Sequence, residues 1–184
     1  MLSEIGITFI AASILASLFL VYYSLTEMKI KNNIISKKIF HLSTLQSIFT
    51  ILSFFTLLFA YIVSDFSLIN VYENSHTTKP LFYKVSGVWG NHEGSLLLWI
   101  TILVLFSFLF LNFNNSLEKK FRLLTLIFQN LLISAFLIFL LSNSNPFSEI
   151  YPTPQEGLGL NPILQDPALA IHPPLLYLGY VGYS

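Results

Sequence analysis

The chain has 184 residues, of which 54% are hydrophobic and 10% are charged, and its formal net charge is zero. Because soluble domains carry about 25% charged residues, a chain of this composition cannot cover a water-facing surface, and lipid must be its main solvent. The absence of cysteine excludes disulfides, cysteine-ligated zinc or iron–sulfur sites, a thiol nucleophile and haem attached through a Cys-x-x-Cys-His motif.

Four apolar segments follow one another along the chain, and each is bounded by charged residues. Each has more than 20 residues, which at about 1.5 Å per residue is enough for a helix to cross the ~30 Å hydrocarbon core of a bilayer. The first segment lacks the basic start and the cleavage site of a signal peptide, so we interpret it as a spanning helix. The predicted spans are residues 5–26, 39–64, 95–117 and 123–148.

A fifth helix is predicted at the end of the chain. His172 is followed by Pro173 and Pro174. A residue before proline is disfavoured in the α region, whereas proline is well tolerated in the first turn of a helix. We therefore expect an extended loop up to His172 and the truncated start of a fifth helix over residues 173–184, with the imidazole at its mouth.

Basic residues are concentrated in two short connections. Residues 27–38 and 118–122 hold seven of the nine Lys and Arg residues. The positive-inside rule places these connections in the cytoplasm or matrix, and the N-terminus and the loops 65–94 and 149–172 outside. The sequence has no internal repeat, so we interpret residues 1–184 as a single membrane domain. The sequence thus predicts an all-α, polytopic transmembrane helix bundle with four full spans, a truncated fifth helix and its N-terminus outside.

The entry to the third span, VWGNHEGSLLLW, combines glycines with polar side chains. Its glycines permit tight turns, and Ser95 is the expected N-cap. His92 and Glu93 are adjacent and point in different directions on a regular helix, so they indicate a metal site only weakly. The alternative interpretation is a capped helix start with Trp89 and Trp99 as interfacial anchors.

His172 is the strongest candidate for a functional side chain. A neutral imidazole at the rim of an apolar pocket is a common axial ligand of haem iron, and a helix N-terminus favours anions such as haem propionates. Asp166, six residues earlier, is a candidate carboxylate for orienting the imidazole. The alternative is an interfacial histidine that is hydrogen-bonded within a proline-rich loop. His41 and His76 are interpreted as having no functional role.

Several classes of function are disfavoured by the pattern of charges. The four predicted spans contain no Asp, Glu, Lys or Arg, which argues against an ion pump, a proton relay or a transporter. The sequence also contains no glycine-rich phosphate loop, no catalytic triad and no basic patch for nucleic acid.

Several long stretches of the chain resemble a single protein family. WGNHEGSLLLW (89–99), SNPF (144–147), LNPILQDPALAIHPPLLYLGYVGYS (160–184) and the loop 65–90 are similar to the N-terminal part of CcmF, the large membrane subunit of the cytochrome c haem lyase. The resemblance runs through essentially the whole chain, in order and at similar spacing. The related CcmC and CcsA-type proteins share the general scheme but not this long N-terminal arrangement.

The resemblance implies a role in cytochrome c biogenesis at the bacterial inner or mitochondrial inner membrane. The chain would take part in moving haem b from the haem chaperone CcmE to apocytochrome c, together with a CcmH-type subunit. His172 would correspond to the first of two outward-facing histidines that bind the haem iron. The residues expected around that haem are Trp89, His92, Glu93, Asp166, Pro173 and Tyr177.

The family's second outer histidine and its tryptophan-rich loop have no counterpart in this sequence. The chain is therefore expected to be either a piece of a longer protein or one product of a split gene, with a second polypeptide supplying the rest. Alone, it is not expected to catalyse thioether formation. The alternatives are a membrane scaffold subunit that does not bind haem and a related haem exporter.

Overall fold

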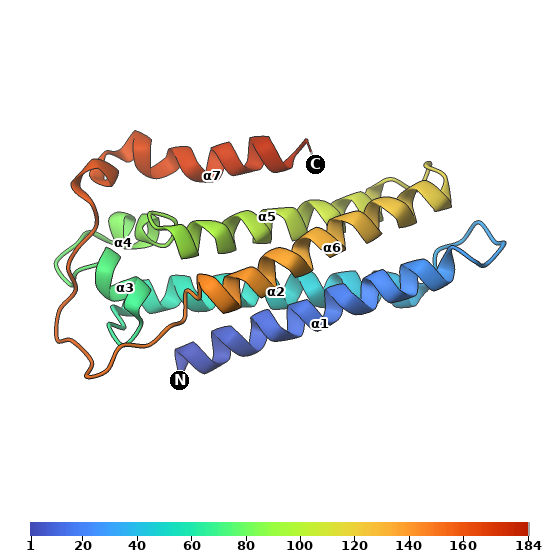
Figure 1. Ribbon diagram of the computed structural model, residues 1–184. Helices are drawn as coiled ribbons and strands as arrows, with labels where there is room; N and C mark the ends of the chain where they lie inside the picture. The colour runs from blue at the N-terminus through green and yellow to red at the C-terminus, as the bar shows by residue number, and fades with distance from the viewer. Residues whose placement is uncertain (184) are drawn as a thin grey trace.

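The computed structural model describes residues 1–183, and four long helices packed side by side make up most of it (Figure 1). They are α1 (Leu2–Glu27), α2 (Lys37–Val63), α5 (His92–Phe113) and α6 (Lys119–Asn143). Each is long and apolar enough to cross a membrane, which confirms the four predicted spans. The shorter elements are α3 (Ile69–Asn74), α4 (Leu81–Gly87), the 3₁₀ helix η1 (Pro162–Gln165) and α7 (Pro167–Val181). Ser184, the last residue of the predicted fifth helix, lies outside the described residues.

The four long helices form a closed ring. Helix α1 contacts α2 and α6, and α5 contacts the same two helices from the opposite side. Helix α7 lies outside the ring along α5, and its start also contacts α4 and η1 (Figure 1). With 15 residues, α7 is about 22 Å long at 1.5 Å per residue, which is shorter than the hydrocarbon core.

Small polar residues form the interface between α1 and α2. The hydroxyls of Ser13 and Thr50 are 2.7 Å apart and hydrogen-bonded, and the Ser53 hydroxyl donates to the Gly6 carbonyl at 3.3 Å. Small side chains allow the two backbones to approach closely, while the hydroxyls satisfy one another away from water. Large apolar side chains such as Phe128 remain exposed on the outside, as expected for a surface that faces lipid.

The two ends of the ring carry opposite charge. The connections 28–36 and 114–118 lie at one end, and the N-terminus, α3, α4 and η1 lie at the other (Figure 1). The first end, with the helix ends beside it, takes in residues 27–38 and 118–122, and we name it the basic end. It has seven Lys and Arg residues against two carboxylates, a formal charge of +5. The second, the acidic end, has two Lys residues against seven carboxylates, a formal charge of −5. The zero net charge therefore conceals a strong polarity along the bundle.

Helix α7 begins six residues earlier than predicted. It starts at Pro167, not at Pro173, so the prediction of an extended loop up to His172 is wrong. The reason is a stronger start signal: the Asp166 carboxylate accepts hydrogen bonds from the N–H groups two and three residues on, at 2.8 and 3.1 Å, and proline occupies the first helical position. His172 therefore lies inside the helix.

Two other predicted boundaries are displaced by local capping. Helix α5 begins at His92 because Asn91, not Ser95, is its N-cap. Helix α6 ends at Asn143, before the predicted residue 148, because the SNPF segment turns away from it. In that turn the Phe147 N–H donates to the Asn145 side chain at 3.0 Å. This hydrogen bond stabilises a turn in place of a further turn of helix.

The predicted outer loop 65–94 is largely helical. Helices α3 and α4 lie within it, and backbone hydrogen bonds attach it to the segment after α6. The Ile69 N–H donates to the Ser148 carbonyl and the Ile150 N–H to the Ser67 carbonyl, both at 2.9 Å. These bonds hold the two long connections together at the acidic end.

Candidate functional site

A buried polar network fixes the start of α5 at the acidic end. The Tyr61 hydroxyl donates to the Asn70 side-chain oxygen at 2.7 Å and accepts from the Asn91 amide at 3.0 Å. The Asn70 amide in turn donates to the Asn91 side-chain oxygen at 2.8 Å. Tyr61 and Asn70 are both buried, so these bonds form away from solvent, where an unpaired polar group would be costly. The network joins α2, α3 and α5 into one rigid corner.

Gly94 completes that corner. Its N–H donates to the Asn91 side chain at 2.8 Å and so caps α5. A Cβ atom at this position would lie 1.7 Å from the Val88 carbonyl oxygen, a separation that no backbone tolerates. The close approach of two backbone segments therefore requires glycine here.

His92 and Glu93 lie on different sides of α5. Glu93 accepts a long hydrogen bond of 3.4 Å from Asn70, within the polar network. His92 is exposed and lines a shallow cavity of about 250 Å³ between α5, α6 and α7. The two side chains thus point in different directions, as the sequence predicts for adjacent residues on a helix.

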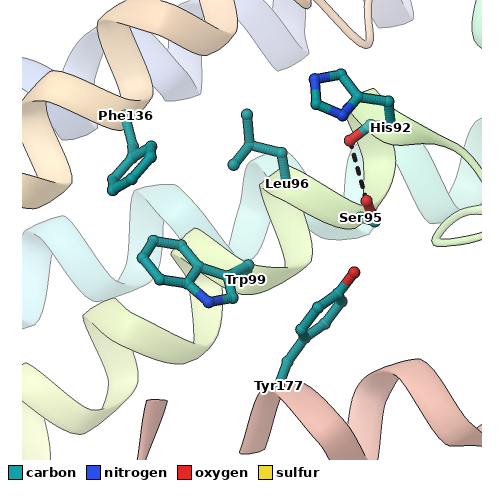
Figure 2. A pocket seen from close by; sticks show the side chains of 6 residues that line it. All are labelled: His92, Ser95, Leu96, Trp99, Phe136 and Tyr177. Carbon is teal, nitrogen blue, oxygen red and sulfur yellow. Dashed lines mark hydrogen bonds between the residues drawn. The ribbon is translucent and has the colours of Figure 1, made fainter. Parts of the chain in front are cut away.

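The cavity beside His92 is mostly aromatic. Figure 2 shows Trp99 and Phe136 against one another, at 4.8 Å between ring centroids and in an edge-on arrangement, with the Tyr177 hydroxyl pointing toward Ser95. Leu96 completes the lining (Figure 2). Ligand pockets occupy about 300–1,000 Å³, so this cavity is too small to enclose a molecule of that class.

Trp89 attaches the start of α7 to the bundle. Its indole N–H donates to the Ala170 carbonyl at 2.8 Å, and Ala170 is buried at the contact. That carbonyl is free because residue 174, its normal partner four positions on, is a proline with no N–H. Pro174 thus removes a hydrogen bond inside the helix, and Trp89 replaces it from outside.

His172 lies on the face of α7 that points away from the bundle. Ala170, Tyr177 and Val181 lie at helical positions about 140–200° from His172, and they form the face that packs inward. His172 itself is exposed. Within residues 1–183, no hydrogen bond or ion pair engages its imidazole.

An apolar groove lies on the same outward face and begins about one helical turn after His172. Gly179 is seven residues further on and within about 20° of His172 in helical angle. A Cβ atom added to Gly179 would have no neighbouring atom within 4 Å. The groove has a volume of about 330 Å³. Its lining residues are Leu175, Leu176, Gly179, Tyr180 and Tyr183.

The predicted site residues thus fall into separate groups. His92 and Tyr177 share the aromatic cavity, and Trp89 holds α7. Asp166 uses its carboxylate to cap α7. His172 lies on the opposite face of α7 from Tyr177. Among the residues that the structure describes, no three His, Cys, Asp or Glu side chains come together as a metal site.

The sequence did not predict the polar network, although it held a signal for it. Tyr61 and Asn70 occur within otherwise apolar stretches. A polar side chain in such a stretch needs a partner when it is buried. The partner lies 21 residues further on, at Asn91, and only the fold shows which polar residues meet.

The long connection after α6 is held by an ionised carboxylate. The Thr77 hydroxyl and backbone N–H donate to Glu156 at 2.5 and 2.9 Å, and these bonds lower the pKa of Glu156 to about 2. The Leu158 N–H also donates to the Tyr72 carbonyl at 2.8 Å. The segment that leads into η1 and α7 is therefore fixed at neutral pH.

Known proteins match most of the chain in sequence. The cytochrome c-type biogenesis protein CycK of Rhizobium meliloti is 57% identical over 132 residues, which are 72% of this chain and 20% of the relative. CcmF of Escherichia coli, also a cytochrome c-type biogenesis protein, is 44% identical over 133 residues, 72% of this chain and 21% of the relative. The chain spans about a fifth of the length of these relatives.

A solved structure shares the fold. The cytochrome c heme lyase CcmF matches with a TM-score of 0.82 and 24% sequence identity, covering 99% of this chain and 28% of the solved chain. The likeness confirms the predicted helical membrane architecture, and the sequence matches confirm the resemblance to CcmF. The family described as Cytochrome C assembly protein matches residues 89–184. This chain, a multi-pass membrane protein, belongs to the cytochrome c assembly protein family.

Proposed function

We propose that this chain is the part of a cytochrome c biogenesis protein that presents His172 as an axial ligand to haem iron, during transfer of haem to apocytochrome c. The observation that carries the proposal is the position of His172, which is exposed, has no polar partner among residues 1–183, and lies about one helical turn before an apolar groove. Family membership and the names of the relatives support the same process.

The side chains on this face fit a porphyrin bound from one side. A neutral imidazole supplies a lone pair to iron, and the groove over Gly179 supplies an apolar surface for the macrocycle. Haem provides the iron and the vinyl groups that react. This chain holds the imidazole on a rigid helix and offers apolar surface beside it.

A ligand for the second side of the haem iron must come from elsewhere. Among residues 1–183, the other candidate imidazole at the acidic end, His92, lines a cavity on the inward side of α7. A second axial ligand is therefore expected from the part of the longer protein that the relatives contain and this chain does not, or from a second polypeptide.

The acidic end is proposed to be the functional face, directed to the periplasm or the intermembrane space. The positive-inside rule places the basic end, with its formal charge of +5, in the cytoplasm or matrix. The outer loops would then receive the haem chaperone CcmE, a CcmH-type subunit and apocytochrome c. The membrane is a bacterial inner membrane or a mitochondrial inner membrane.

Replacement of His172 by alanine in the complete protein tests the proposal. We expect His172→Ala to abolish cytochrome c maturation, because the iron loses an axial ligand. The matched control is His41→Ala, since His41 is also exposed and lies near the basic end of α2. Holocytochrome c, detected by its peroxidase activity after electrophoresis, is the measurement.

The expected result is no holocytochrome c with His172→Ala and wild-type levels with His41→Ala. Wild-type levels with His172→Ala would refute the proposal and favour a scaffold that does not bind haem. The quantity of membrane-inserted protein is measured in parallel, because equal amounts in both variants separate loss of function from loss of folding.

A further inference from the structure

The basic end contains a cavity that the proposed function does not use. It has a volume of about 310 Å³ and lies between the connection 28–36 and the start of α6. Its lining residues are Met28, Ile30, Lys31, Asn32, Asn33, Glu118, Lys119, Lys120 and Leu123.

Two lysines of this cavity have no carboxylate partner. Lys119 is neutralised, because its ammonium group is 3.0 Å from the Glu27 carboxylate and also contacts Asn32. Lys31 and Lys120 are exposed, and neither forms an ion pair within the described part of the chain. They face an environment that already carries excess positive charge, and an anion would relieve their repulsion.

The start of α6 adds to the attraction for an anion. Glu118 is the N-cap residue, and its side chain makes no capping hydrogen bond. The first backbone N–H groups of the 25-residue helix are therefore open to an acceptor at the positive end of the helix dipole. The Glu118 carboxylate lines the cavity and opposes an incoming anion.

The remaining lining of the cavity is apolar. Met28 and Ile30 contribute hydrocarbon surface beside the lysines, and the buried Leu123 lies behind them. A site with cations on one side and hydrocarbon on the other matches a molecule that carries a phosphate and an acyl chain. The ends of spanning helices lie at the depth of lipid headgroups.

We propose that this cavity binds an anionic phospholipid, with the phosphate between Lys31 and Lys120 and an acyl chain against Met28 and Ile30. The site is independent of haem handling and of His172. It would anchor the connection between α1 and α2 to the start of α6.

Native mass spectrometry of the full chain in a neutral detergent tests this site, with phosphatidylglycerol and phosphatidylcholine as probes. Each lysine near an anionic lipid contributes about fivefold in affinity, so Lys31→Gln with Lys120→Gln is expected to lower phosphatidylglycerol affinity about 25-fold. Phosphatidylcholine binding is expected to be weak and unchanged. Glu118→Gln is expected to raise phosphatidylglycerol affinity, because the opposing charge is lost. A gain of this kind cannot arise from misfolding.

The matched control is Lys29→Gln with Lys37→Gln. These two exposed lysines lie at the same end but do not line the cavity, and their removal changes the net charge equally. The control is expected to retain phosphatidylglycerol affinity within about twofold. Equal losses in both double variants would overturn the site in favour of a diffuse attraction. Inorganic phosphate that displaces phosphatidylglycerol at equal concentration would overturn the choice of a lipid.

Discussion

Gly94 shows how one residue fixes the corner beside the candidate site. The α-carbon of Gly94 lies so close to Val88 that a built Cβ atom is 1.7 Å from the carbonyl oxygen. The atom that would clash belongs to the backbone, so a side-chain rotation cannot relieve the overlap.

Replacement of Gly94 by alanine is expected to destabilise the protein by about 3 kcal/mol or more, because the N-terminus of α5 must move away from Val88. Gly179→Ala is the matched control. No atom lies within 4 Å of its built Cβ position, and alanine favours a helix interior by up to about 1 kcal/mol.

Thermal unfolding in detergent measures both variants. The midpoint is expected to fall for Gly94→Ala and to stay level or rise slightly for Gly179→Ala. Equal midpoints for Gly94→Ala and the wild type would show that the corner adjusts without cost.

For single residues, the sequence predicts that a glycine or a capping residue is needed, but not which residue forms the cap. The glycines of the WGNHEGS segment are correctly expected to permit close turns. The cap is assigned to Ser95, whereas Asn91 caps the helix. Both residue types are good caps; the bonds of Asn91 to Tyr61 and Asn70 decide between them, and these bonds exist only in the folded chain.

Helix α7 depends on a hydrogen bond from another element. Prolines at positions 173 and 174 remove two donors from its second turn. The Ala170 carbonyl accepts the Trp89 indole instead, at 2.8 Å. Because Ala170 lies two residues before His172, this bond also fixes the position of the candidate iron ligand.

Trp89→Phe is expected to loosen α7, because the variant keeps an aromatic ring but leaves a buried carbonyl without a donor. Loss of such a partner costs about 1–3 kcal/mol, which corresponds to roughly 5- to 150-fold faster amide hydrogen exchange in α7. Hydrogen exchange followed by mass spectrometry measures the effect.

Trp99→Phe is the control for this experiment. Trp99 packs edge-on against Phe136, and its indole N–H forms no hydrogen bond in the described residues. The same atoms are removed, and exchange in α7 is expected to change little. Indistinguishable exchange rates in the two variants would mean that the Trp89 bond does not hold the helix.

The spanning helices were predictable, but the start of α7 was not. Apolar length predicts a span without knowledge of its neighbours. Two start signals compete near His172, one at Asp166–Pro167 and one at His172–Pro173. The helix starts at the first signal because Asp166 caps it there. It continues through the second because the Trp89 indole replaces the hydrogen bond that Pro174 cannot donate.

The whole molecule is polarised from one end to the other. The formal charges of +5 and −5 at the two ends follow from the sequence once the helices are paired. The end at which each loop lies was predictable from the alternation of spans. The contacts of His172 were not, because they depend on which face of α7 packs against α5.

Cysteine labelling tests the orientation of the bundle in the membrane. The chain contains no cysteine, so single exposed cysteines can be introduced at Thr153 in the acidic end and at Asn33 in the basic end. In intact cells or spheroplasts, a membrane-impermeant maleimide is expected to label Thr153→Cys and not Asn33→Cys. The reverse pattern would place His172 on the cytoplasmic or matrix side and contradict the proposed delivery face.

Haem ligation by His172 is the central claim, and the Soret absorption of the purified complete protein tests it most directly. In His172→Gly we predict loss of the haem spectrum, and its return when free imidazole occupies the space left by the side chain. Restoration by imidazole requires a folded site, so it separates ligation from structure. A His172→Gly protein with wild-type haem content and an unchanged Soret band would contradict the claim.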